Sequence, residues 1–399
     1  MLGKGLLDEA PTSLPRSGDM KTSAKIQSSV GRDTSHATDF RKMVRFLTGT
    51  SFSAIFYVRY SYGYIGAGYF LIMTVFIVPV ACVATVLTLF PMIYLSLPVF
   101  NYSENNLCRL VNNLWVSASV YCGLNLVEYG ADLSAYTEKR CLFLANHLGL
   151  VDHFIVMQSL HNKGRVSGNW MWVIYNIWKY TPLGIMWMAH GNFFINGGAS
   201  RKTALLRSFK NHLRNFFYKF DYRWIVMYPE GSRLFLIKES CARFAEEMRL
   251  QPLSHCVYPR SGAAHAVIDV LGPARGSEEG DLLHFVKILL STSSKLSRCG
   301  GGPPIEYIID ATLGYPKGIV PDIRSILLGE KCFPDSGVCI HYEVIRVNPE
   351  WHDESKLQGF LYKRYQEKVD LDSIFIIIYD MMQILLIVYA NVDSYQLTT

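Results

Sequence analysis

CLFLANHLGLVDHFIVMQSL, residues 141–160, opens with five apolar residues and breaks at the polar pair Asn146-His147. A short apolar run that ends at a polar break is typical of a buried strand. Gly149 then permits a turn, after which the apolar residues resume. The stretch therefore predicts a strand that leads through a turn into a helix.

His147 and Asp152 stand five positions apart in this stretch. On one continuous helix that step rotates by about 500°, which would leave the two side chains roughly 140° apart. Pairing therefore requires His147 in the turn and Asp152 near the start of the helix. A carboxylate bonded to one ring nitrogen fixes the tautomer and leaves the other nitrogen free to accept a proton near neutral pH. We predict a catalytic His-Asp pair.

The same residues allow two other interpretations. A histidine beside an acid can be merely a satisfied polar pair, and the spacing alone does not distinguish the two cases. His147, Asp152 and His153 also resemble a cluster of metal ligands. An H-x-H-x-D-H metallohydrolase pattern, however, would need histidines where Leu148 and Leu150 stand. We therefore expect no metal at this site.

The composition suggests a membrane-associated protein with one large core. Half of the 399 residues are apolar, 18% are charged and the mean hydropathy is +0.15, which leaves apolar sequence beyond what an α/β core needs. Nine cysteines without a C-x-x-C pair argue against a disulfide framework or structural zinc site. The net charge of +6 could favour anionic lipid or a polyphosphate cofactor. No nucleic-acid recognition motif is present.

The N-terminal part divides into a polar tail and an apolar segment. Residues 1–40 are rich in Ser, Thr, Gly and Lys and lack periodic apolar positions, so we expect a disordered tail. No charged residue stands between Ser61 and Ser103, and basic residues precede this run. We therefore predict a membrane anchor over residues 41–103.

The apolar run has room for two membrane helices, because one spanning helix needs about 20 residues. Pro79 separates residues 61–78 from residues 80–98, which suggests a bent hairpin. The basic flank should stay cytoplasmic, and a hairpin would return the rest of the chain to that side. One straight span would do the opposite, and a pair of buried core helices is a third interpretation.

Several later segments have the pattern of a strand. Trp224–Tyr228, His255–Tyr258 and Ile305–Ile309 each end in a polar turn, the last at Asp310-Ala311-Thr312, and we also expect a strand after Gly191 and a late edge strand over Val338–Val347. Polar groups at strand ends are where open α/β sheets bind ligands. We predict an α/β fold with a mostly parallel sheet, flanking helices and N-terminal membrane helices, the catalytic domain covering residues 104–370.

Other segments are predicted to be helical or to pack in the core. Ala199–Phe220 is predicted to form a helix with basic residues at spacings of three and four, which form a solvated face or contact phosphate or anionic lipid. Trp170–Trp187 is dense in aromatics and Met, a composition more typical of a core than of a cofactor site. Residues 371–399 form an apolar tail whose segment Ile374–Ala390 is an amphipathic helix at the membrane surface or a poor span.

The turn Pro229–Arg233 carries an acid and a base together. Gly231 lets the backbone approach a ligand closely, and an arginine can bind phosphate through two parallel hydrogen bonds. Taken alone, the same residues also make an ordinary turn.

Four blocks now follow in one order: N-H-x4-D at Asn146–Asp152, G-x-F-F-I at Gly191–Ile195, Y-P-E-G-S-R at Tyr228–Arg233 and V-Y-P at Val257–Pro259. This order resembles the glycerolipid acyltransferases that use 1-acylglycerol-3-phosphate and other lysophospholipids. The later segments YPRSGA and DATLGYP resemble the membrane branch that contains lysophosphatidylglycerol, lysophosphatidylethanolamine and lysocardiolipin acyltransferases.

The resemblance implies roles for these residues. His147 would be the general base that takes the proton from a lysophospholipid hydroxyl, and Asp152 would orient and polarise it. The third block would bind the head group of the acyl acceptor, and the fourth is linked to the use of acyl-CoA. The residues expected to bind substrate are Asn146, Gly191, Phe194, Arg201, Glu230, Gly231, Ser232, Arg233, Val257 and Pro259.

The second block departs from the family pattern. It usually ends in an arginine two residues after the isoleucine of the strand, but here Asn196 and Gly197 follow Ile195, and the nearest later base is Arg201. The missing phosphate contact makes lysophosphatidic acid a less natural acceptor. It leaves room for a lysophospholipid with a larger head group.

We therefore predict an acyl-CoA-dependent lysophospholipid acyltransferase, with lysophosphatidylglycerol or lysophosphatidylethanolamine favoured. Acyl-CoA is a co-substrate, and we expect no bound cofactor and no nucleic-acid partner. We expect the protein in the endoplasmic reticulum bilayer with its active site facing the cytosol. The alternatives are a 1-acylglycerol-3-phosphate acyltransferase, an inactive lipid-binding relative and a hydrolase, although no G-x-S-x-G elbow supplies a serine nucleophile.

Overall fold

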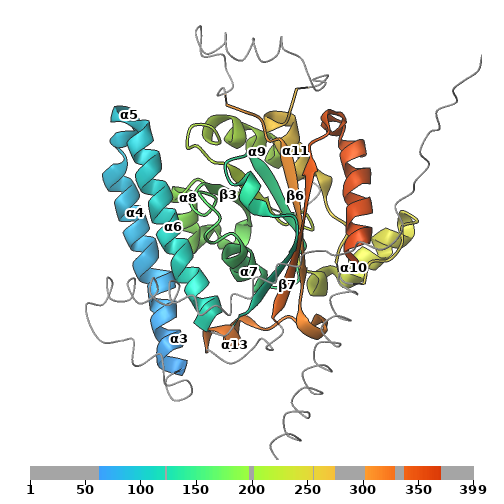
Figure 1. The fold of residues 1–399 in the computed structure, drawn as a ribbon, viewed down its shortest axis with the longest axis horizontal. Helices are drawn as coiled ribbons and strands as arrows, with labels where there is room; N and C mark the ends of the chain where they lie inside the picture. The colour runs from blue at the N-terminus through green and yellow to red at the C-terminus, as the bar shows by residue number, and fades with distance from the viewer. Residues whose placement is uncertain are drawn as a thin grey trace, which may run out of the picture. The chain divides into compact units, whose positions relative to one another are not determined.

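The structure is a computed structural model that describes residues 63–121, 124–196, 202–254, 256–274, 302–328 and 337–369 (Figure 1). The tails expected at residues 1–40 and 371–399 lie outside the described residues. So do Gly197 and Arg201 of the second block.

A seven-stranded sheet forms the centre of the fold, in the order β1-β7-β6-β2-β5-β3-β4. The strands are β1 (Leu126–Gly130), β2 (Cys141–Ala145), β3 (Trp170–Tyr175), β4 (Phe193–Ile195), β5 (Trp224–Met227), β6 (Tyr307–Gly314) and β7 (Val338–Arg346). The five strands from β6 to β4 are parallel, whereas β7 pairs antiparallel with β6 and parallel with β1. The predicted α/β fold with a mostly parallel sheet and flanking helices is confirmed.

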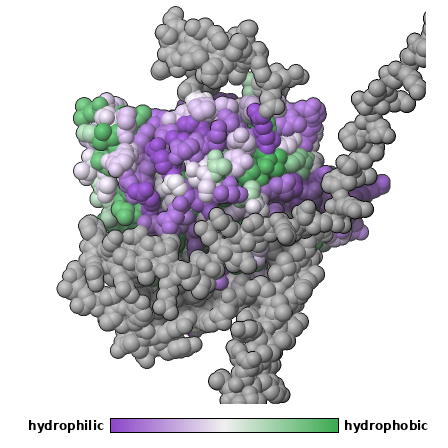
Figure 2. Space-filling view, viewed as in Figure 1, coloured by the Kyte–Doolittle hydropathy of each residue, from purple (hydrophilic) through white to green (hydrophobic). Residues whose placement is uncertain are grey.

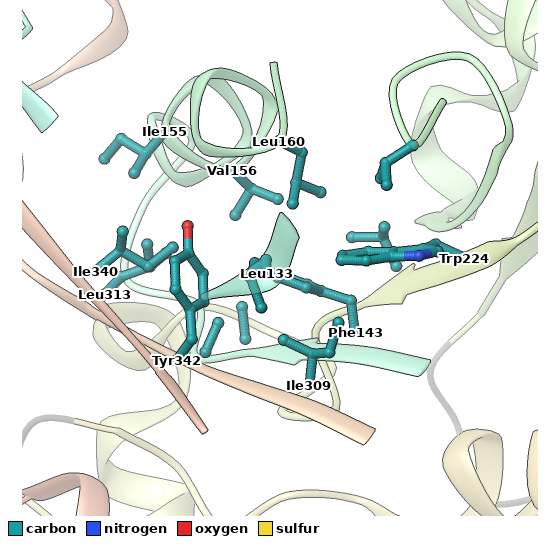
Figure 3. Close-up of a cluster of buried hydrophobic side chains, with 14 of the residues drawn as sticks. Leu133, Phe143, Ile155, Val156, Leu160, Trp224, Ile309, Leu313, Ile340 and Tyr342 are labelled. Atoms are coloured by element: carbon teal, nitrogen blue, oxygen red, sulfur yellow. The ribbon is translucent and has the colours of Figure 1, made fainter. Parts of the chain in front are cut away.

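Helices cover both faces of the sheet, which is why all five residues of β2 are buried. On one face Phe143 stacks with Trp224, and both belong to a buried cluster that includes Ile155 and Val156 of α7 (Asp152–Ser159), which Figure 3 shows. On the other face Leu142 and Leu144 pack against α9 (Lys202–Phe216) and α11 (Ser261–Leu271). Strands buried on both faces give continuous apolar runs, and this is the pattern from which β2 was predicted.

Three strand predictions need correction. Residues 256–258 lie outside the strands, because their side chains pack as irregular chain against α10 (Leu234–Glu247). Val338–Val347 was expected at the edge of the sheet, but β7 lies between β1 and β6, so β1 is the edge on that side. The turn expected at Asp310-Ala311-Thr312 is instead part of β6.

Asp310 does not end β6, because the strand is paired on both sides and the carboxylate is neutralised. Its Oδ2 accepts from Nε of Arg364 at 2.9 Å, and its Oδ1 lies 2.6 Å from Nζ of Lys368. Both bases come from the helix at 354–369, which packs on the sheet. Lys368 is fully buried and also donates to the carbonyl of Ala311 at 2.5 Å.

The N-terminal helices form a long column and a return. α3 (Gly63–Ile72), the π-helix η1 (Met73–Ile77) and α4 (Val78–Leu89) run on without a break, and after a turn at Phe90-Pro91 the chain returns through α5 (Met92–Leu95) and α6 (Leu97–Tyr121) (Figure 1). The bend expected at Pro79 is therefore wrong. A proline clashes with the carbonyl four residues earlier, and here that residue, Val75, lies in the wider π-turn.

Among the described helices, one is long and apolar enough to cross a membrane, and it covers Ala67–Leu89. The returning helix α6 carries several polar residues, including Glu104 and Asn112, and packs against α7. The expected N-terminal apolar helix of membrane-spanning length is therefore present, and its insertion into a membrane remains a prediction. The in-and-out hairpin remains a prediction.

Candidate active site

The turn between β2 and α7 brings His147 against Asp152. His147 follows the end of β2 in irregular chain, and Asp152 is the first residue of α7. Nδ1 of His147 lies 2.8 Å from Oδ2 of Asp152. The local geometry predicted for this pair is thus present, while its catalytic role remains a prediction.

The carboxylate of Asp152 is fully buried and accepts hydrogen bonds from four donors. Oδ2 accepts from the backbone N–H groups of Leu148 at 2.6 Å and Gly149 at 2.9 Å, besides the His147 ring. Oδ1 accepts from the hydroxyl of Tyr315 at 2.5 Å. Burial, with the Asp152 charge adding, raises the pKa of Tyr315 well above its usual range, so the hydroxyl keeps its proton. With Asp152 held in this way, Nε2 of His147 is left as the proton acceptor.

Aromatic rings enclose the His147 imidazole. The ring of Tyr228 stacks on it with centroids 4.4 Å apart, and the His153 ring lies 5.5 Å away. Trp172 contacts the rings of both Tyr228 and His153, at 6.2 and 5.8 Å. Burial and the neighbouring His147 lower the pKa of His153 to about 3, so its ring is neutral at physiological pH.

Glu230 holds the backbone of the turn between β2 and α7, which we name the catalytic turn after its predicted role. Its Oε1 accepts from the N–H of His147 at 3.0 Å, and the side chain is fully buried. Burial raises the pKa of Glu230 well above its usual range. Because no part of the side chain is exposed, this placement gives no support to the head-group contact expected for Glu230.

Asn146 also has a structural position. Its amide nitrogen donates to the carbonyl of Leu313 at 3.0 Å, and its Oδ1 accepts from the N–H of Leu313 at 2.7 Å. The residue is fully buried. The two bonds tie the end of β2 to β6, so the substrate contact expected for Asn146 is not supported.

The third and fourth blocks meet beside this turn. Gly231 is exposed, with φ of +71°, and a Cβ there would lie 3.4 Å from Cδ of Arg260. The N–H of Arg260 donates to the carbonyl of Pro229 at 2.8 Å. Arg233, half-buried, caps the start of α10, and its charge acts on His153. The Arg260 side chain therefore lies against the exposed Gly231, and Arg233 follows two residues later in the chain.

The other predicted residues of these blocks have different positions. Ser232 is half-buried in the turn, whereas Val257 and Pro259 are buried beneath it. The backbone of Val257 hydrogen-bonds to Glu230. The buried residues of the fourth block thus contact Glu230 of the third block from the protein interior.

The second block lies partly away from the catalytic turn. Gly191 precedes β4, whereas His147 follows β2, so the two lie toward opposite ends of the parallel strands. Gly191 has φ of +89°, and a Cβ would meet the hydroxyl of Tyr222 at 2.5 Å, which accounts for a glycine there. Phe194 is half-buried within β4.

An apolar cavity of about 330 Å³ lies beside the catalytic turn. Its wall is formed by the N-terminal helices, α7 and α8 (Pro182–Ala189), with side chains from β3. At the catalytic end it is lined by Leu150, His153, Trp172 and Ile174.

A buried polar pair lines the other end of the cavity. Oε1 of Glu104 lies 2.5 Å from Nδ1 of His190, whose Nε2 donates to the carbonyl of Trp170 at 2.9 Å. Burial acts to lower the pKa of His190, but Cys108 and Glu104 raise it well above the usual range. Trp170 begins β3, four residues before Ile174, so the pair lies about 13 Å from the catalytic end along the strand.

In the part of the chain that the structure describes, no three His, Cys, Asp or Glu side chains form a group that could hold a metal ion. The expected absence of a catalytic metal stays a prediction.

No protein-family model matches the chain. The chain is 55% identical over 302 residues to a Caenorhabditis elegans protein provisionally named 1-acyl-sn-glycerol-3-phosphate acyltransferase acl-12, covering 75% of this chain and 73% of that protein. It is 32% identical over 292 residues to the human acyl-CoA:lysophosphatidylglycerol acyltransferase 1, covering 73% of this chain and 75% of that protein. The mouse protein of the same name is 30% identical over 297 residues, with the same coverage.

The chain belongs to the glycerolipid acyltransferase family. The family resemblance, the membrane branch with lysophosphatidylglycerol acyltransferases and the expectation of an acyltransferase enzyme are confirmed. Within this acyltransferase, three residues near His147 were not selected from the sequence: Trp172, Arg260 and Tyr315. A weak signal existed for two of them, because Arg260 and Tyr315 lie in the segments YPRSGA and DATLGYP, which resemble the membrane branch of the family.

Proposed function

We propose that the protein transfers an acyl chain from acyl-CoA to the free hydroxyl of a lysophospholipid, with His147 as the general base. The observation that carries this proposal is the pairing of His147 with a buried, fully hydrogen-bonded Asp152 at one end of an apolar cavity. Lysophosphatidylglycerol and lysophosphatidylethanolamine are the favoured acceptors. Acyl-CoA acts as a co-substrate, and we propose no bound cofactor.

In the proposed reaction one proton passes from the acceptor hydroxyl to His147 and then to the CoA thiolate. Nε2 of His147 takes the proton of the acceptor hydroxyl while Nδ1–H stays bonded to Asp152. The acceptor oxygen attacks the thioester carbon, the carbon–sulfur bond breaks, and the CoA thiolate takes the proton from His147. General-base assistance of this kind contributes about 10²–10⁴-fold to the rate.

The cavity fits an acyl chain in polarity and length. Each methylene moved from water into such a wall contributes about 0.8 kcal/mol. Leu71 and Val86 both line it and are fifteen residues apart on one continuous helix, a separation of about 22 Å. One leaflet of a bilayer core, which holds one acyl chain, is about 15 Å thick. The Glu104–His190 pair lines the cavity within this length, about 13 Å from the catalytic end along β3, and a chain pressed against it would meet buried charges.

Arg233 and Arg260 are the proposed partners of the acceptor's phosphate, since the exposed Arg260 lies against Gly231 and the half-buried Arg233 starts the helix that follows this turn. They would replace the arginine that the second block lacks at Gly197. Without that fixed guanidinium, a larger head group offers the acceptor additional contacts. A 1-acylglycerol-3-phosphate acceptor is the second candidate, favoured by the name of the Caenorhabditis elegans relative.

An apolar surface supports a bilayer as the partner. Large apolar side chains are exposed along the N-terminal helices and on the adjacent α8 with its preceding turn, and Figure 2 shows hydrophobic residues over α4 and α5. Examples are Val80, Leu87, Tyr94, Leu95, Ile177, Tyr180 and Ile185. We place the protein in the endoplasmic reticulum membrane with its active site facing the cytosol, where acyl-CoA is available.

The test is an assay of the full chain in detergent or vesicles with acyl-CoA and three lysolipids: lysophosphatidylglycerol, lysophosphatidylethanolamine and lysophosphatidic acid. We expect diacyl product with the first two at higher kcat/KM than with the third. Free fatty acid in place of diacyl lipid would indicate a hydrolase, and acyl-CoA binding without any turnover would indicate an inactive lipid-binding protein.

A matched pair of variants tests the acceptor site. Arg260→Gln should raise the KM of the acceptor, since a hydrogen bond to a charged group contributes about 1.5–3 kcal/mol, or roughly 10–150-fold. Arg243→Gln changes an exposed arginine on α10 and is the control. An equal effect of both variants would show that general surface charge, and no specific contact, attracts the acceptor.

A further inference from the structure

We infer that the indole N–H of Trp172 is the hydrogen-bond donor that stabilises the oxyanion formed on the thioester carbonyl during acyl transfer. This inference rests on the proposed function of the site. It assigns a catalytic role to a residue of the segment Trp170–Trp187, whose aromatic and Met content is more typical of a core than of a cofactor site.

The position of Trp172 follows from the strand that carries it. Alternate residues of β3, Trp170, Trp172 and Ile174, face the cavity, while Met171 packs on the opposite face of the sheet. The backbone N–H of Trp172 donates to Oδ1 of Asn192 at 2.8 Å, which fixes the backbone at this position. The side chain is only 5% exposed. β3, which is paired with β5 on one side and β4 on the other, thus positions the ring.

Trp172 lies at the end of the cavity where the reaction would occur. Its ring centroid is 6.2 Å from that of Tyr228, and the Tyr228 ring stacks on His147. It is 5.8 Å from the His153 ring, which also lines the cavity. An acyl chain in the cavity would therefore bring its thioester to the cluster of rings, Trp172, His153 and Tyr228, that lies beside His147.

The indole Nε1 of Trp172 has no hydrogen-bond partner among the residues that the structure describes. Indole N–H is a donor only and usually has a partner when buried. An unsatisfied buried donor costs about 1–3 kcal/mol. A carbonyl oxygen supplied by the substrate would remove that cost, and a developing negative charge would do so more strongly.

An unpartnered indole is not by itself a site, as two other tryptophans show. Nε1 of Trp224 and Nε1 of Trp115 are also buried without a partner in the described residues. Trp224 lies in the sheet core and does not line the cavity, and Trp115 contacts the rings of Phe154 and Trp187 on the helical side. Trp115 also lines the cavity, but Trp172 both lines it and contacts the Tyr228 ring that stacks on His147.

The chemistry balances with Trp172 in this role. As the acceptor oxygen bonds to the thioester carbon, the carbonyl π electrons move onto oxygen, and Trp172 donates its N–H to that oxyanion without losing the proton. When the carbonyl re-forms, the carbon–sulfur bond breaks and CoA leaves with the proton held by His147. Removing one oxyanion donor typically lowers kcat by about 10²–10³-fold.

The experiment replaces Trp172 by 3-benzothienylalanine, in which sulfur replaces the indole N–H in a ring of nearly the same shape. We expect kcat to fall about 10²–10³-fold, with the KM of both substrates unchanged within about threefold. The same replacement at Trp224 is the control and should leave kcat unchanged. Equal kcat for the two proteins, or a change confined to the acceptor's KM, would overturn the assignment.

A second measurement does not depend on turnover. In the His147→Ala background, bound acyl-CoA labelled with ¹³C at the carbonyl should show a lower carbonyl stretching frequency with Trp172 present than with the benzothienyl residue. An identical frequency would overturn the inference even if kcat had changed. A wild-type protein that binds acyl-CoA but forms no diacyl lipid would contradict the proposed function, and the infrared comparison would still decide whether Trp172 contacts the carbonyl.

Discussion

Tyr315→Phe removes a single hydroxyl that donates to Oδ1 of Asp152 at 2.5 Å. The carboxylate keeps its three donors on Oδ2, from the His147 ring and two backbone N–H groups. Oδ1 stays buried and loses the donor that it has among the described residues. A hydrogen bond to a charged group contributes about 1.5–3 kcal/mol. We expect the free energy of unfolding to fall by that amount.

The fall in kcat should be smaller than the full energy of the hydrogen bond would cause. If the whole bond strengthened catalysis, kcat would fall by roughly 10–150-fold, because about 1.36 kcal/mol corresponds to a factor of ten. The hydrogen bond is already present before the reaction, and that share of its energy stabilises the protein without raising kcat. We therefore expect kcat to fall about tenfold with both KM values unchanged.

The assay combines urea unfolding with steady-state kinetics on the same preparations. Tyr342→Phe is the control, since Tyr342 is a buried tyrosine of the neighbouring strand β7 and its hydroxyl is not one of the donors to Asp152 among the described residues. Unchanged stability of Tyr315→Phe would show that the bond contributes nothing. A fall of kcat beyond about 10³-fold would show that Tyr315 takes part in the chemistry directly, which would refute its supporting role.

Five further outcomes are expected. His147→Ala should abolish acyl transfer and leave the protein folded and membrane-bound; Asp152→Asn should lower kcat by about 10²–10⁴-fold with little change in acceptor KM, and an effect on KM alone would contradict the general-base role. Chelators should leave activity intact, and loss restored specifically by zinc would reverse this expectation. Because burial lowers the pKa of His153 to about 3, the unfolded chain binds its proton first as pH falls, so stability should decline from about pH 6.5 toward pH 3; His153→Phe should remove that part of the decline in a urea titration. Cysteines introduced near Asn162 and Lys317, after replacement of the native ones, should react with an impermeant thiol reagent in sealed, right-side-out microsomes, whereas labelling only after detergent would place them in the lumen.

The parts of the site that are local in sequence could be predicted from it. The strand, the turn and the helix start that hold His147 and Asp152 lie within twelve consecutive residues, 141–152, and the apolar pattern there is decided by burial on both faces. Gly231 and Arg233 were likewise found as one turn after one strand. In such stretches, periodicity and turn chemistry agree with the tertiary structure.

The predictions that failed depend on distant parts of the chain. Asp310 reads as the end of a strand until Arg364 and Lys368 neutralise it from a helix more than fifty residues away. Pro79 reads as a helix break until the preceding π-turn removes the clash. The edge position expected for β7 required the sheet order, which local patterns do not contain.

The same reasoning accounts for why the supporting residues of His147 were missed. Asn146 and Asp152 are bound by Leu313 and Tyr315, which lie at the end of β6 and just beyond it. These contacts exist only because β6 is the parallel neighbour of β2, with Ala145 opposite Ala311. The catalytic turn is therefore held by the late half of the sheet as much as by its own sequence. A change that shifts the register of β6 would displace Asp152 and lower kcat without touching any residue of the four family blocks.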